Sequence, residues 1–166
     1  MARRAFYSFH YIPDNWRASQ VRNMGAVEGD APVSDNDWET ITRGGDAAIE
    51  RWIDSQLSGK ACTIVLVGQN TAGRKWISYE ISESWNKQKG ILGIRVHNLK
   101  DANQKQALPG GNPFDDVTFR KTGAKLSMVV QLYDPPYMDS TAVYKYIKDN
   151  ISGWVEKAIT IRNSHE

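Results

Sequence analysis

The feature that most constrains the fold is the run ACTIVLVG at residues 61–68, which is almost entirely apolar and rich in β-branched residues. A continuous apolar run of this length, bounded by glycine, is typical of a strand that is buried on both faces, as in parallel sheets. The run therefore predicts a central strand with helices packed above and below it. Cys62, which lies inside the run, is expected to be a small buried core residue.

Further strands and helices alternate along the chain. Short apolar segments predict strands at 5–9, 91–99 and 125–133, and apolar residues at helical spacing predict helices at 14–23, 45–60, 74–90 and 141–160. Asp14 or Asn15 is the expected N-cap of the first helix. Residues 24–44 predict a long loop with room for one short strand. The alternation predicts a single α/β domain over residues 1–166, with a mainly parallel sheet and helices on both faces.

Composition and motifs exclude several classes of function. The net charge is +2 with both signs mixed along the chain, so no basic stripe typical of nucleic-acid binding is present. One cysteine and three scattered histidines offer neither a disulfide nor a metal-binding cluster. The dinucleotide-binding, P-loop, zinc-protease and nucleophile-elbow patterns are all missing from the sequence. Because no segment resembles a secretory signal or a membrane span, we expect a soluble cytoplasmic protein that holds no metal and no bound cofactor.

The expected site lies where strands end. Open parallel sheets bind ligands outside the carboxyl ends of their strands, which here are the loops after Phe9, Gly68 and His97. The segments HYIPD, GQNTAGRKW and HNLKD are therefore expected to build the site. On the helix at 74–90, Trp76 and Glu80 lie one turn apart, beside the stripe that faces the sheet. This position on the helix fits two interpretations equally well. Glu80 and Trp76 could be a solvated glutamate and a packing tryptophan, or they could be a functional pair.

Five blocks of sequence, in order over residues 4–119, resemble one family. The blocks are FYSFHYIPDNWRASQVRN, AIERWIDSQL, TIVLVGQNTAGRKWISYEI, GILGIRVHNLKD and NPFDDV. Together they resemble the TIR-like family to which the Thoeris antiphage protein ThsB belongs. The W-x-x-x-E spacing of Trp76 and Glu80 also matches the wider class of enzymatic TIR domains, in which that glutamate is catalytic. The resemblance implies a flavodoxin-like three-layer sandwich.

The resemblance also implies an activity. NAD+ would be the substrate rather than a cofactor, and the bond between nicotinamide and ribose would be cleaved with Glu80 as the catalytic residue. The product would be a cyclic or otherwise modified ADP-ribose, a diffusible signal that activates a partner effector protein. Enzymatic TIR domains often assemble, so self-association is expected. The loop at 24–44 lacks an aromatic residue that some relatives carry, which leaves the product isomer open.

Six further residues are expected to bind the substrate. Four would offer flat surfaces to the bases and two would meet the diphosphate. The aromatic residues are Phe9, Tyr11, Trp38 and Trp76, with Trp16 as one more aromatic candidate, and the diphosphate contacts are His10 and Arg17. Phe9 also suits core packing, and Arg17 also suits an exposed helix position.

Two other functions remain open on the sequence. One is a TIR-like interaction module that self-assembles without turnover and needs no carboxylate at Glu80. The other is a small-molecule binder of flavodoxin-like form. The lack of a hydroxyl-rich phosphate loop after the first strand argues against flavin in that second case.

Overall fold

The central sheet has five strands in the computed structural model, which describes residues 3–29 and 40–165. The strands are β1 (Arg4–Ser8), β2 (Glu28–Gly29), β3 (Cys62–Val67), β4 (Gly90–Arg95) and β5 (Leu132–Tyr133). All neighbouring pairs are parallel, and the order across the sheet is β2-β1-β3-β4-β5. This is the flavodoxin-like strand order, whose topological switch point lies between the first and third strands.

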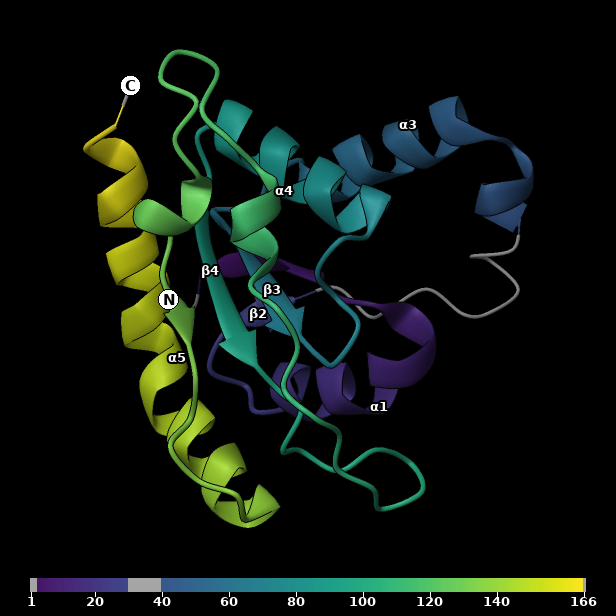
Figure 1. Ribbon diagram of the computed structural model, residues 1–166, viewed down its shortest axis with the longest axis vertical. Coiled ribbons are helices and arrows are strands. Elements are labelled where there is room, and N and C mark those ends of the chain that lie inside the picture. Colours follow the sequence, from purple (N-terminus) through teal and green to yellow (C-terminus); the bar gives the residue numbers. More distant parts are fainter. Residues whose placement is uncertain (1–2, 30–39, 166) are drawn as a thin grey trace.

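Helices cover both faces of the sheet, which confirms the predicted three-layer α/β fold. They are α1 (Tyr11–Arg22), α3 (Asp46–Leu57), α4 (Lys75–Asn86) and α5 (Ser140–Asn163). α1 and α5 pack on one face, whereas α3 and α4 lie together on the other (Figure 1). None of the helices within the described ranges combines the length and the apolar character needed to cross a membrane.

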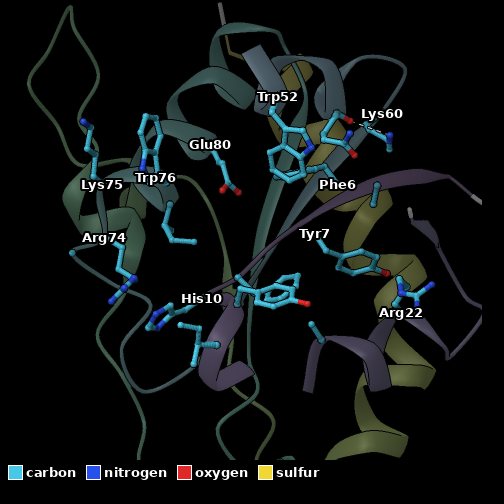
Figure 2. A pocket seen from close by; sticks show the side chains of 18 residues that line it. Phe6, Tyr7, His10, Arg22, Trp52, Lys60, Arg74, Lys75, Trp76 and Glu80 are labelled. Carbon is cyan, nitrogen blue, oxygen red and sulfur yellow. Dashed lines mark hydrogen bonds between the residues drawn. The ribbon is translucent and has the colours of Figure 1, made fainter. Parts of the chain in front are cut away.

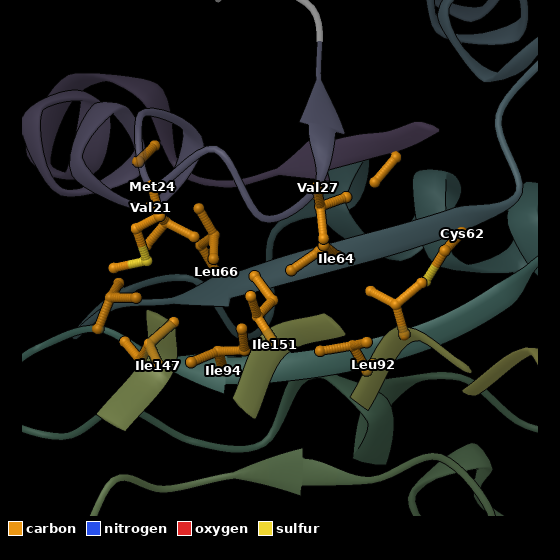
Figure 3. Packing of buried hydrophobic residues seen from close by; sticks show 14 of the residues in the cluster. Val21, Met24, Val27, Cys62, Ile64, Leu66, Leu92, Ile94, Ile147 and Ile151 are labelled. Carbon is orange, nitrogen blue, oxygen red and sulfur yellow. The ribbon is translucent and has the colours of Figure 1, made fainter. Parts of the chain in front are cut away.

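The run that predicted a doubly buried strand is β3, and every one of its residues is buried. Ile64 and Leu66 pack among side chains of α1 and α5, as Figure 3 shows for Val21 and Ile151. The alternate residues of β3 pack under α4. Each fully buried aliphatic side chain of this kind contributes about 1.5–3 kcal/mol. Cys62 is also buried, as expected, and burial raises the pKa of its thiol to about 12.

Helix α1 begins at Tyr11, earlier than the sequence predicted, and its N-cap is His10 rather than Asp14 or Asn15. The backbone N–H of Asp14 donates to the His10 carbonyl oxygen at 3.1 Å, which closes the first turn. Pro13 is compatible with this turn because the first helical N–H groups have no partner inside the helix. Asp14 is buried one turn further on and cannot act as a cap.

The predicted strand at 125–133 is wrong for most of its length. A 3₁₀ turn occupies Leu126–Met128, and only Leu132–Tyr133 pair with β4. Leu126 and Val130 are both buried against the residues beneath α4. The apolar residues of this segment are therefore buried by turns. The segment does not need to pair as a strand along its whole length.

Candidate active site

A cavity of about 480 Å³ lies beside β1. Its walls come from β1, α1, α3 and the start of α4 (Figure 2). Small-molecule sites commonly enclose about 300–1,000 Å³, so the cavity is large enough for a nucleotide-sized ligand. Its place next to β1 and α4 corresponds to the switch point between β1 and β3, where sheets of this order bind ligands.

The carboxyl group of Glu80 enters the cavity from α4. Its side chain is buried, with a relative exposure of 8%, which is deeper than the rim position expected from the sequence. In Figure 2 the carboxyl lies between the rings of Trp76 and Trp52. Its Oε2 atom is buried and has no hydrogen-bond partner among the described residues.

Burial controls the protonation of Glu80. Loss of solvent raises the pKa of this carboxyl to about 8, because the charged form loses its hydration. The Ser8 hydroxyl on β1 opposes the shift, since a polar group beside the carboxyl favours the ionised form. The Ser8 hydroxyl oxygen is itself buried without a well-formed hydrogen bond in the described part of the chain. The carboxyl is therefore largely neutral near neutral pH.

The backbone at Glu80 is anchored to the central strand. The Ser84 hydroxyl donates to the Glu80 carbonyl oxygen at 2.6 Å. The same hydroxyl lies 2.7 Å from Thr63 Oγ1 on β3. Both side chains are fully buried, so this link fixes α4 against the sheet one turn from the acid.

Four of the six predicted substrate-binding residues line the same cavity as Glu80. They are Phe9, His10, Tyr11 and Trp76. The Phe9 and Tyr11 rings stack with their centroids 6.0 Å apart. The pKa of His10 is lowered by burial and by the nearby Arg74 guanidinium, and its Nδ1 atom is buried without a partner in the described residues. The structure thus brings two separate sequence blocks to one cavity, while their roles stay predictions.

Arg17 does not reach this cavity. Its guanidinium is 4% exposed and turned inward, where it donates to the carbonyl oxygens of Leu99 at 2.8 Å and Lys105 at 2.9 Å. It also donates to Asp14 Oδ1 at 2.9 Å. Arg17 therefore ties α1 to the loop after β4, and neither a diphosphate contact nor an exposed position describes it.

The structure does not place two other predicted contributors, Trp38 and the loop HNLKD, at the cavity. Trp38 lies outside the described residues, so its predicted role is not addressed by the structure. The loop HNLKD, expected to contribute to the site, is absent from the described lining of the cavity. His97 in that loop is buried, and its burial lowers its pKa.

Several lining residues were missed on the sequence. Trp52 of α3 and Phe6 of β1 form an aromatic wall opposite Trp76. Basic side chains also line the cavity: Arg22, Lys60, Arg74 and Lys75. Glu80 is the one acidic side chain among the described residues of the lining. Arg74 and Lys75 belong to the segment GQNTAGRKW, which was expected to build the site, although neither residue was given a role there.

Polar contacts hold the Trp52-bearing helix α3 against α4. Lys75 pairs with Asp46 at 2.5 Å, and Asp54 receives the Tyr79 hydroxyl at 3.3 Å and Lys87 Nζ at 3.3 Å. Tyr79 also packs edge-on against Trp76 at 5.6 Å. These contacts keep the two tryptophan-bearing helices together along one side of the cavity.

The lining of the cavity suits a polar or cationic organic ligand with flat rings. Within residues 3–29 and 40–165, no group of three or more His, Cys, Asp or Glu side chains is placed to hold a metal ion. Aromatic rings, a lone carboxyl and peripheral basic groups can together bind flat rings and phosphates.

The comparison with known families gives a direct match. Residues 6–101 match the family described as Thoeris protein ThsB, TIR-like domain. That segment contains α1, α3, β3, α4 and most of β1, and so every described lining residue of the cavity except Ala5.

A curated relative is the protein named "Putative cyclic ADP-D-ribose synthase ThsB1" from Bacillus cereus (strain MSX-D12), which is 37% identical over 125 residues. The matched segment covers 72% of this chain and 65% of the relative, so the chain matches less than two thirds of the relative's length. The matched family segment and this relative together show that the chain belongs to the TIR-like family of Thoeris protein ThsB.

Proposed function

We propose that this protein is an enzyme that cleaves NAD+ at the nicotinamide–ribose bond and releases a cyclic or otherwise modified ADP-ribose. The observation that carries the proposal is the buried carboxyl of Glu80 inside an aromatic-walled cavity at the switch point of the sheet. The name of the Bacillus cereus relative, a cyclic ADP-D-ribose synthase, supports the same chemistry.

The chemistry needs one carboxylate. When the C1′–N bond breaks, nicotinamide leaves with the bonding electron pair as a neutral base, so no general acid is required. The ribose becomes oxocarbenium-like, and a nearby carboxylate stabilises its positive charge, as carboxylates do in glycoside hydrolysis. A hydroxyl or ring nitrogen of the same substrate then attacks C1′, and one proton is released as the ring closes. Holding that nucleophile close gives it an advantage over water.

The other lining residues fit the remaining parts of NAD+. The Trp76 and Trp52 rings flank the carboxyl, where the nicotinamide and its ribose would bind. His10 and Arg74 lie near each other at the first turn of α1 and the start of α4. Arg74 takes the diphosphate role that the sequence had given to Arg17, because a guanidinium offers paired donors to phosphate oxygens.

In the cell, the product would act as the signal of a Thoeris antiphage system. The diffusible nucleotide would activate a partner effector in infected cells. Self-association of this chain is part of the proposal, as it is for other enzymatic TIR domains, and cytoplasmic NAD+ would be the source of the substrate.

The test is mass spectrometry of nucleotides from phage-infected cells that carry the wild type, Glu80→Gln or Glu83→Gln together with the effector. Glu83 lies on the same helix as Glu80, is partly buried beside Lys87 and does not line the cavity, so it is the matched control. We expect nicotinamide and an ADP-ribose derivative from the wild type and from Glu83→Gln. Glu80→Gln should lower their formation at least about a hundredfold, the scale of losing a main electrostatic contributor.

Equal product from Glu80→Gln and the wild type would overturn the catalytic assignment. If all three proteins protect cells equally and no NAD+ product forms in any of them, the chain acts as an interaction module instead.

A further inference from the structure

Within the described part of the chain, Glu80 is a buried acid without a counter-charge. Its carboxyl is held among the aromatic and apolar side chains of Phe6, Trp52, Trp76 and Ile77, which line the same cavity. Its Oε2 atom has no hydrogen-bond partner in the described residues. An ionised carboxylate in such surroundings costs free energy unless a positive charge accompanies it.

The charged groups around Glu80 do not supply that positive charge. The uncharged Ser8 on β1 is the polar group beside the carboxyl, and the basic His10 and Arg74 line the same cavity from the start of α1 and the residue before α4. Burial raises the pKa of the carboxyl and Ser8 lowers it, and no basic side chain among the described residues contributes to the shift. The remaining basic residues of the lining are Arg22, Lys60 and Lys75.

The neighbouring helix α3 brings no competing charge into contact with Glu80. Asp46 is paired with Lys75 at the surface. Asp54 binds Tyr79 and Lys87. Neither aspartate lines the cavity, so the site presents one acid between aromatic faces. The face of a tryptophan ring attracts cations, and Trp52 and Trp76 flank the acid (Figure 2).

We propose that the site selects ligands with a positively charged flat ring by exchanging the Glu80 proton for that ring, with Trp52 as a specificity-determining wall. This inference deepens the proposed function and rests on it for the identity of the ring, the nicotinamide ring of NAD+. The exchange is balanced: the carboxyl loses one proton to solvent, the carboxylate stays, and the cationic ring takes its place as counter-ion. A neutral ring, as in NADH or free nicotinamide, brings no charge and leaves the proton in place.

Isothermal titration calorimetry of the full chain can count the proton. The probes are the 1-methylnicotinamide cation, which has no ribose to react, and neutral nicotinamide, each titrated near pH 7 in two buffers of different ionisation enthalpy. With the pKa of Glu80 at about 8, we expect roughly 0.9 protons released per bound cation, because a group of that pKa is about nine-tenths protonated near pH 7. Nicotinamide should release none.

Affinity against pH gives a second readout. Between about pH 6.5 and pH 8, cation affinity should rise close to tenfold per pH unit and then level off, as one-proton linkage requires. This window lies above the titration of His10, whose pKa is lowered from its ordinary value. Glu80→Gln should show a flat profile and no proton release, whereas Glu83→Gln should behave as wild type.

Trp52→Leu tests the aromatic wall. We expect it to weaken the cation by about five- to thirtyfold, the scale of a desolvated cation–π contact, and to change nicotinamide less. Trp16→Leu is the control, because Trp16 is 53% exposed on α1 and does not line the cavity.

Three results would overturn the inference: no binding of the cation, binding without proton release, or the same release from Glu80→Gln. Each can be told apart from failure of the proposed function. If NAD+ is turned over but binding releases no proton, only the proposed exchange is wrong. If binding releases a proton but NAD+ is not turned over, only the enzyme assignment is wrong.

Discussion

At the scale of single residues, the burial of Glu80 should be measurable as a pH-dependent destabilisation. The pKa of Glu80 is about 8 in the folded protein against an ordinary value of 4.5. The folded state therefore binds the proton more tightly than the unfolded state. The contribution of Glu80 to stability is fully present below pH 4.5 and is lost as the pH rises through about 8.

Glu80→Gln removes this titration while keeping the shape of the side chain. We expect the variant to match the wild type near pH 4.5 and to exceed its free energy of unfolding by roughly 2–4 kcal/mol near pH 9. Urea unfolding at a series of pH values measures the difference. A gap that stays constant with pH would contradict the burial of an ionisable carboxyl, and Glu83→Gln should follow the wild type throughout.

At the scale of elements, the contact between β4 and α5 depends on a missing side chain. A Cβ atom at Gly90 would lie 2.8 Å from the backbone nitrogen of Ile159 and 2.9 Å from the carbonyl carbon of Ala158. Backbone atoms cannot move aside as a flexible side chain can. The strand and the helix therefore approach this closely only because residue 90 is glycine.

Gly90→Ala should consequently lower the free energy of unfolding by about 1–3 kcal/mol, the usual cost of overpacking. The control is Gly153→Ala within α5, where a Cβ atom would meet nothing within 4 Å. That change should stabilise the protein by about 0.5–1 kcal/mol, because alanine favours a helix over glycine. Thermal and urea unfolding of the two variants would show shifts of opposite sign, and a stabilised Gly90→Ala would contradict the packing.

The elements that could be predicted from the sequence are those whose pattern is local. β3 shows itself as a continuous apolar run, and α4 shows a regular apolar stripe closed by a glycine. The segment from Leu126 to Tyr133 misled because its apolar residues are buried by turns, and a short apolar run does not distinguish turns from a strand.

The candidate site was predictable to the same extent. Glu80 and Trp76 come from a recognisable motif, and His10 from the end of a predicted strand. Trp52 lies on an apolar stripe of α3, and the sequence of one helix does not show which element that stripe packs against. Its place opposite Trp76 therefore depends on tertiary packing. Arg17 was misjudged because its partners are the carbonyls of Leu99 and Lys105, which are far away in the sequence and carry no side-chain signature.

At the scale of the whole molecule, Arg17 joins distant parts of the chain. It connects α1 with the loop that follows β4 through two carbonyl oxygens and neutralises the buried Asp14. Burial raises the pKa of Asp14, and the hydrogen bond and charge of Arg17 oppose that shift. Removing the guanidinium alone would take a hydrogen bond from the Leu99 carbonyl and from the acid, whereas the Lys105 carbonyl would keep the backbone N–H of Asp101.

Arg17→Met should therefore lower the free energy of unfolding by about 3–5 kcal/mol, the cost of breaking a buried pair. The double variant Asp14→Asn with Arg17→Met should recover part of this loss, because no acid is then left unpaired. Chemical denaturation of the single and double variants measures the coupling. The exposed pair of Lys145 and Asp149 is the control, and Lys145→Met should cause no measurable change. An equally small effect at Arg17 would refute its role as a clamp.

The hydrogen-bonded path from Thr63 through Ser84 to the Glu80 carbonyl has an evolutionary consequence. Hydrogen bonds fix the backbone of the acid to β3 in the middle of the sheet. The aromatic and basic side chains around the acid come from other turns and helices. Substitutions in those walls would change which ligand fits while the carboxyl stays where it is. A site built this way can change its lining alone and keep the same acid on α4, anchored to the same inner strand β3.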